Sequence, residues 1–141
     1  MNLVPLNSFM PITQYLVLWT LLQERTPQQS ISHKEMPEWS EHINFVNNHP
    51  YKAWYLICEH RCVPRMWKKL GAIYLTQQNE IGIQIFNKHR GKGLGKEAVQ
   101  QLMRLHPGPY LANINPNNDA SIAFFKKMGF EHIQNTYRLE Q

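Results

Sequence analysis

The sequence predicts a single α/β (α+β) domain in which about four helices flank a mixed, mostly antiparallel central sheet. Its 141 residues suit one domain, and the 43% that are hydrophobic suffice for a core. Three strand-like runs separated by turns within residues 52–86 favour an antiparallel meander. From residue 80 onward strand and helix patterns alternate, which indicates a partly parallel sheet with crossover helices.

The first half of the chain is expected to be mainly helical. Residues 2–6 (NLVPL) suit a short first strand, and Ile12–Arg25 carries apolar residues at helical spacing. Residues 26–37 are polar and are expected to form a loop. A second helix is predicted to open at Pro37-Glu38, because proline and acidic residues are favoured in the first turn of a helix.

The second half of the chain alternates between strand and helix patterns, with aromatic and β-branched residues concentrated in the strands. The expected strands are residues 52–59, Trp67–Thr76, Glu80–Phe86 and Tyr110–Ile114, the expected helices are Leu94–Leu105 and Asn117–Met128, and one or two final strands follow from Phe130. This order places a glycine-rich segment between a strand and a helix.

The net charge of +5 suits an anionic ligand or nucleic acid, and equally a mildly basic surface with no partner. The most apolar run, Tyr15–Leu22, is too short to span a bilayer. Met1–Met10 lacks the basic region of a signal peptide. We therefore expect a cytoplasmic protein that does not associate with membranes.

The two cysteines, Cys58 and Cys62, lie four residues apart on either side of His60. Two cysteines and one histidine do not complete a structural zinc site, which takes four ligands. We therefore expect no bound metal, and reduced thiols of the kind found in cytoplasmic proteins.

The glycine-rich segment HRGKGLGKEA, residues 89–98, runs into the predicted helix that starts at Leu94. Unpaired amides at a helix N-terminus bind phosphate well. A Walker loop would need Ser or Thr after Lys96, where Glu97 stands, and the G-x-G-x-x-G dinucleotide pattern is absent. The spacing that does fit is R-x-x-G-x-G, formed by Arg90, Gly93 and Gly95.

This pattern resembles the acetyl-CoA signature of the GNAT N-acetyltransferase superfamily, and a second segment resembles the other signature of that family. Residues 115–130 (NPNNDASIAFFKKMGF) match its spacing at Asn118, Ser121, Phe124, Phe125, Gly129 and Phe130. The resemblance covers roughly residues 70–135. It implies one GNAT-like domain over residues 1–141 with a splayed strand pair, in which residues 1–50 supply acceptor-side helices and residues 51–141 form the acetyl-CoA-binding core.

The resemblance implies acetyl-CoA as acyl donor and a set of residues that hold it. The pyrophosphate would lie on the backbone amides of the signature loop, and the pantetheine arm would pair with the preceding strand like an added strand. Asn118 would bond the pantetheine or simply cap its helix, and Lys92, Lys96 and Lys126 would meet phosphates or remain solvated. The implied donor-site residues are Ile83, Gln84, Ile85, Arg90, Gly91, Lys92, Gly93, Leu94, Gly95, Lys96, Asn118 and Phe125.

The implied chemistry is direct attack of an amine on the thioester, with a base to remove the amine proton and an amide near Gln84–Ile85 for the oxyanion. Glu80 is the candidate base, with a plain surface role as its alternative, and His33 and His42 are further candidates. Many family members carry a tyrosine acid where this chain has Phe125. Tyr137, or Tyr110, would then donate the proton, or the thiolate leaves unaided.

The acceptor site of the family lies between the first two helices and their loop, with a strand behind them. The residues implied there are Glu24, Arg25, Ser30, Ser32, His33, Glu35 and His42, with Trp54 and Tyr55 on the strand. The candidate substrate-binding residues are His33, Glu35 and Trp54, together with Asn113 on the later strand, where a subset of the family has Glu. The segment of residues 24–37 is polar and carries both signs of charge, which suits a small polar amine, such as an amino sugar, a nucleotide-linked amino sugar or an amino acid. A protein N-terminus, a nucleobase amine, a CoA-binding module without turnover and a nucleic-acid-binding protein remain alternatives, although the aromatic-basic alternation of single-strand binders is absent. A homodimer is also open.

Overall fold

The computed structural model describes residues 1–29, 35–60 and 67–141. At its centre is a four-stranded antiparallel sheet with the strand order β1-β2-β3-β4. The strands are β1 (Asn2–Pro5), β2 (Ala53–Glu59), β3 (Lys68–Leu75) and β4 (Ile81–Ile85). Strands β2 to β4 are consecutive and antiparallel, so the predicted meander is confirmed.

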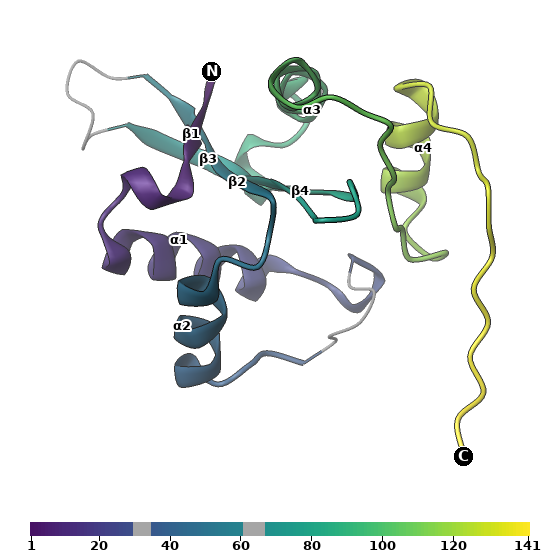
Figure 1. Cartoon of the computed structure of the whole chain (residues 1–141), viewed down its shortest axis with the longest axis horizontal. Coiled ribbons are helices and arrows are strands. Elements are labelled where there is room, and N and C mark those ends of the chain that lie inside the picture. The colour runs from purple at the N-terminus through teal and green to yellow at the C-terminus, as the bar shows by residue number, and fades with distance from the viewer. Residues whose placement is uncertain (30–34, 61–66) are drawn as a thin grey trace.

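Helices cover both faces of this sheet (Figure 1). Helices α1 (Pro11–Glu24) and α2 (Trp39–Asn48) lie on one face, and α3 (Leu94–Leu105) lies on the other. Helix α4 (Asp119–Lys127) stands beyond β4, next to the segment that follows α3. The predicted count of about four helices and the mixed α/β class with a mostly antiparallel sheet are therefore confirmed in the described part of the chain.

The sheet separates two cores, because side chains alternate between the faces of a strand. Buried residues under α3 and α4 include Ile57, Ile73, Leu75, Ile81, Val99, Leu102 and Phe125. Buried residues under α1 and α2 include Leu6, Leu18, Leu21, Val46, Trp54, Leu56 and Phe86. On β4 the odd-numbered isoleucines thus face α3, and the even-numbered positions face α1 and α2.

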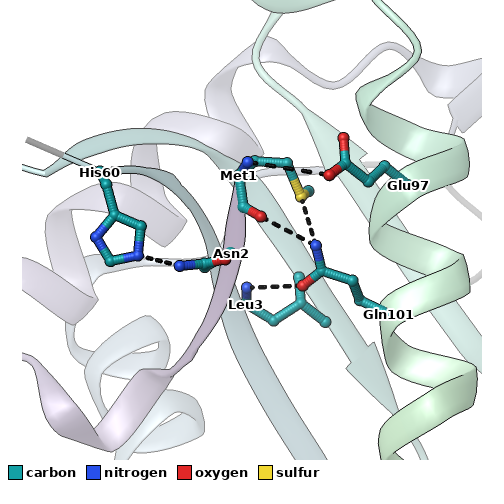
Figure 2. A network of polar contacts seen from close by, with 6 residues as sticks. All are labelled: Met1, Asn2, Leu3, His60, Glu97 and Gln101. Carbon is teal, nitrogen blue, oxygen red and sulfur yellow. Dashed lines mark hydrogen bonds and ion pairs between the residues drawn. The ribbon is translucent and has the colours of Figure 1, made fainter.

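Helix α3 is fixed to the edge strand β1 by a side-chain amide (Figure 2). The Oε1 of Gln101 accepts from the N–H of Leu3 at 3.3 Å, and its Nε2 donates to the carbonyl oxygen of Met1 at 3.0 Å. Glu97, one turn earlier, lies 3.9 Å from the amino group of Met1. These contacts fix the axis of α3 across the sheet and hence the position of its N-terminus beside the end of β4.

Two predicted strands differ from the structure. Within Tyr110–Ile114, only Leu111 pairs, in a parallel bridge with Glu80. Residues 130–141 form no strand, and the segment extends away from the sheet in Figure 1. A sequence with alternating apolar residues forms a strand only where the edge of another strand is available to pair with it. The C-terminal segment has no such partner in the described structure, and its apolar side chains Ile133, Tyr137 and Leu139 are 74%, 89% and 83% exposed.

In the parts of the chain that the structure describes, every helix is too short or too polar to cross a bilayer.

Candidate active site

The glycine-rich loop presents a row of backbone amides. Gly91 and Gly93 adopt positive φ angles of 77° and 76°, a conformation that only glycine takes without strain. Gly93 is the N-cap of α3, and no side chain caps this helix. The first hydrogen bond of the helix runs from the N–H of Glu97 to the carbonyl of Gly93 at 3.3 Å. Among the described residues, the amides of 94–96 have no partner, as expected at a helix N-terminus.

The space above this loop is open. A Cβ placed on Gly91 or on Gly93 would meet no atom within 4 Å. The two glycines therefore serve the backbone conformation and leave room for a ligand rather than relieving a clash. Unpaired amides, a helix N-terminus and open space together fit the binding of a pyrophosphate group.

Positive charge surrounds the loop. Lys92 and Lys96 are exposed and form no ion pair with the described residues, and the Nε of Arg90 donates to the carbonyl of Ile85 at 3.1 Å. Beneath them His89 is 4% exposed, and its Nε2 has no hydrogen-bond partner among the described residues. Burial, followed by the charges of Lys68, Lys92 and Lys88, lowers the pKa of His89. This histidine is therefore neutral near pH 7, and the loop charge comes from lysine and arginine.

The outer edge of β4 has open amides beside the loop, and its carbonyl at Ile85 accepts from Arg90. Thr76 donates to the carbonyl of Glu80 at 2.9 Å and Phe86 donates to that of Leu70 at 2.9 Å, so the even-numbered residues of β4 bond to β3. The odd-numbered residues therefore point outward. The N–H of Ile81 reaches the carbonyl of Leu111 at 2.7 Å, and the two segments form no bridge after that point.

The amides of Ile83 and Ile85 consequently face a gap with no partner among the described residues. Strand β4 and the segment after Leu111 thus diverge, as the family resemblance implies. The alternation also refines one expectation, since the N–H of Gln84 points to β3. Of the pair Gln84–Ile85, only Ile85 has an amide directed to the gap.

The candidate acid–base residues are spread over the structure. Glu80 is half-buried at the start of β4, and its N–H donates to Oγ1 of Thr76 at 2.9 Å. Asn113 lies exposed, two residues after Leu111. The hydroxyl of Tyr110 donates to the carbonyl of Met103 at 3.1 Å and also contacts that of His106. Tyr137 is 89% exposed in the C-terminal segment, so the structure does not bring it to Glu80.

Helix α4 packs against the loop through the second sequence pattern. Oδ1 of Asn118 accepts from the N–H of Ser121 at 3.1 Å, which is an N-cap. The ring of Phe124 lies where a Cβ on Gly95 would approach it to 3.2 Å, so this glycine lets α4 come close to α3. Phe125 is 6% exposed and packs between Phe124 and Phe130, with ring centroids 5.0 and 5.1 Å away.

The predicted acceptor residues do not form one cluster. His33 lies outside the described residues, and Glu35 is exposed. Trp54 is 5% exposed and packs edge-on against Phe45 and Tyr51, with ring centroids 5.8 and 4.7 Å away, so it belongs to the core beneath α2.

A tyrosine pair on the face of the sheet that α1 and α2 cover was not predicted from the sequence. Tyr51 and Tyr74 stack with ring centroids 3.9 Å apart and planes 4° apart. A Cβ on Gly82 of β4 would overlap the ring and hydroxyl of Tyr74, so that ring lies flat over Gly82. A glycine inside a strand signals such a close approach, and this signal could have indicated the pair. Burial, followed by the neighbouring Tyr74, raises the pKa of Tyr51, which keeps its hydroxyl protonated.

The end of α1 is attached to β4 beside this pair. The Nε2 of Gln84 donates to the carbonyl of Leu21 at 2.6 Å, and its Oε1 accepts from Nε of Arg25 at 3.1 Å. The N–H of Asn87 donates to the carboxylate of Glu24 at 2.7 Å. Helix α1 and strand β4 are thus held together.

Comparisons with known proteins agree with this geometry. Residues 72–139 match the family described as FR47-like protein. The peptidyl-lysine N-acetyltransferase YjaB of Salmonella typhimurium strain LT2 is 36% identical over 62 residues, which are 44% of this chain and 42% of that protein. The chain therefore matches less than half the length of this curated relative.

Two solved structures share the fold. An acetyltransferase from Thermus thermophilus superposes with a TM-score of 0.68 at 16% identity, over 95% of this chain and 88% of that one. A domain from Methanocaldococcus jannaschii gives a TM-score of 0.61 at 23% identity, over 86% of this chain and 82% of that one. At these identities, the likeness shows a common fold.

Proposed function

Since the chain belongs to the GNAT superfamily of acetyltransferases, we propose that it moves an acetyl group from acetyl-CoA to a primary amine. The observation that carries this proposal is a pair of unpaired backbone surfaces close together along the chain. The outward amides of β4 are followed, after a short turn at Asn87–His89, by the free amides of the loop at the N-terminus of α3.

In this proposal acetyl-CoA lies along both surfaces. The pyrophosphate takes the amides of residues 91–96, with Lys92 and Lys96 adding charge. The pantetheine arm pairs with the outward edge of β4 at Ile83 and Ile85 as an extra strand would. This leaves the thioester in the gap between β4 and the segment after Leu111.

The acceptor amine then attacks the thioester carbon. The C–N bond forms, the carbonyl oxygen becomes an oxyanion, and an outward amide of β4 that the arm leaves free stabilises it. Glu80, at the start of the same strand, takes the amine proton through water. The C–S bond then breaks. Phe125 has no proton to give, so the CoA thiolate leaves as such or takes a proton from solvent.

For the acceptor we propose a small polar amine, namely an amino sugar, a nucleotide-linked amino sugar or an amino acid. The relative from Salmonella acts on peptidyl-lysine, as its name states. A lysine side chain in a protein is therefore the second acceptor class. Both are primary amines and need the same loss of a proton before attack.

One observation favours a second function. Phe125 is buried and lacks a hydroxyl at the position of the usual acid, and this would suit a module that binds acetyl-CoA without turnover. Release of CoA from acetyl-CoA separates the two, measured over a panel of amino sugars, their nucleotide forms, amino acids and lysine peptides. An acceptor that drives CoA release supports the transferase. A rise in melting temperature with acetyl-CoA, but no release with any amine, supports the module.

The loop assignment has its own test. Gly93→Asp places a carboxylate among the amides proposed for the pyrophosphate, where like charges repel. We expect the stabilisation by acetyl-CoA to be lost while the protein remains folded. An unchanged stabilisation would show that the donor does not bind this loop.

A further inference from the structure

Hydrogen-bond donors converge on the α1/α2 face of β4, beside the edge proposed for the thioester. The ring of Tyr74 lies over Gly82 with its hydroxyl above that residue, and Tyr51 stacks on Tyr74. Two residues further along the same face, Gln84 binds Nε of Arg25 at 3.1 Å. The guanidinium is close enough to Tyr51 to oppose the rise in its pKa.

The side-chain amide of Gln84 in this cluster is already occupied at both its oxygen and its nitrogen. The Oε1 of Gln84 accepts from Arg25 and its Nε2 donates to Leu21. Arg25 forms no ion pair within residues 1–29, 35–60 and 67–141, so its charge is not neutralised there. Tyr51 and Tyr74 share a hydrogen bond, so the cluster offers the terminal N–H groups of the guanidinium and one phenol hydroxyl. Such a set matches the oxygens of a carboxylate or phosphate, which accept several donors at once.

Its position relates this set to the reaction. Glu80, Gly82 and Gln84 share one face of β4, and alternate residues of a strand are about 7 Å apart. Ile83 and Ile85, on the outer edge, are the residues proposed to hold the arm of the donor. The ring of Tyr74 fills the space over Gly82. A small acceptor beside this ring would therefore lie on the face of β4 that carries both Glu80 and the Arg25–Gln84 pair.

We propose that this cluster is an acceptor subsite for the anionic group of the substrate, so that the preferred acceptor is a primary amine carrying a carboxylate or a phosphate. The inference rests on the proposed function and gives its acceptor a chemical class. It disfavours polyamines, because a second ammonium would face Arg25. It also disfavours a lysine side chain that has no anionic group near its amine.

The test compares matched acceptors that differ only in charge. Release of CoA is measured for amino acids against their amides, for amino sugar phosphates against the free amino sugars, and for a lysine peptide. We expect kcat/KM for the anionic member of a pair to exceed that of its neutral partner about tenfold or more. The pair with the larger ratio distinguishes a carboxylate from a phosphate.

Variants then assign the preference to the subsite. Arg25→Gln should reduce the anionic-to-neutral ratio to about one through a higher KM for the anionic acceptor. Arg25→Lys should restore part of it, since lysine keeps the charge but loses the fork. Tyr74→Phe keeps the stack and removes one donor, and should lower the ratio less. Arg104→Gln changes an exposed arginine on α3 and is the matched control, which should leave the ratio unchanged.

The outcomes separate this inference from the function on which it rests. Neutral or cationic amines acetylated as well as anionic ones, or an Arg25→Gln enzyme with the wild-type ratio, would overturn the subsite while the transferase stands. No release of CoA with any amine would contradict the proposed function. Acetyl-CoA should raise the melting temperature of Arg25→Gln as much as that of the wild type, since the donor loop is intact.

Discussion

Replacing Gly82 by alanine should destabilise the fold through one identifiable clash. The new Cβ would overlap Cζ, Cε1 and the hydroxyl oxygen of Tyr74. The ring cannot retreat from β4, because Tyr51 lies against its other face at a centroid distance of 3.9 Å with nearly parallel planes. Carbon atoms in van der Waals contact lie about 3.5–4.0 Å apart, so the two rings cannot move closer together. Both rings must therefore move together.

The expected magnitude combines two effects. Overpacking a filled site costs about 1–3 kcal/mol, and disturbing a stacked aromatic pair costs about 0.5–1.5 kcal/mol more. We expect Gly82→Ala to lower the free energy of unfolding by about 2–4 kcal/mol, measured by denaturant titration.

A double-mutant cycle tests the cause. In a Tyr74→Ala background the clash is absent, so Gly82→Ala should there be nearly neutral or slightly stabilising, because alanine loses less backbone entropy than glycine on folding. The same cost in both backgrounds would show that the ring does not lie over Gly82, and would remove the basis for the proposed subsite.

Three further changes test other parts of the structure. Gln101→Ala removes the bonds to Leu3 and Met1 and should lower the free energy of unfolding, measured with denaturant, by about 1–3 kcal/mol. The control Gln100→Ala, at an exposed neighbouring residue, should lower it little. Equal effects of the two variants would show that Gln101 does not hold α3 to β1. The pKa of His89 lies below its ordinary value of 6.5 in the folded chain, so the folded protein should lose stability as the pH drops through 6.5 and below. His89→Gln should reduce the loss of melting temperature between pH 7.5 and 5, whereas the control His132→Gln should not. An unchanged loss in His89→Gln would show that His89 does not cause this pH dependence. Phe125→Tyr buries a hydroxyl in the core and should lower stability by about 1–3 kcal/mol without raising kcat; a faster enzyme would mean that position 125 faces the thioester.

Local signals predicted most of the fold. The helix expected over Leu94–Leu105 has those bounds in the structure, because a glycine before it and the HPGP sequence after it mark both ends. Strands β2 to β4 were predicted from aromatic and β-branched runs between turns. The strand predicted over Tyr110–Ile114 is reduced to one bridge at Leu111, because this segment diverges from β4 after that bridge. The local sequence pattern does not indicate such a divergence.

The part of the candidate site that consists of backbone groups was predicted from the sequence. Glycine spacing indicated the amide row of the loop, and the position of Phe125 indicated a missing acid. Side chains brought together by the sheet were not predictable in the same way. Trp54 looked like a pocket residue and lies in the core, whereas Tyr74 meets Tyr51 only because β2 and β3 pair in the register that sets Trp54 opposite Tyr74.

The amide of Gln101 has a consequence for self-association. Exposed strand edges recruit further strands and lead to aggregation. On β1 the outward N–H of Leu3 is already taken by Gln101, and the next outward position is Pro5, which has no N–H to offer. Within the described chain, this leaves β4 as the edge of the sheet that can accept a strand. That edge is also the one proposed for the arm of acetyl-CoA, so a bound donor would shield the protein from unwanted strand pairing.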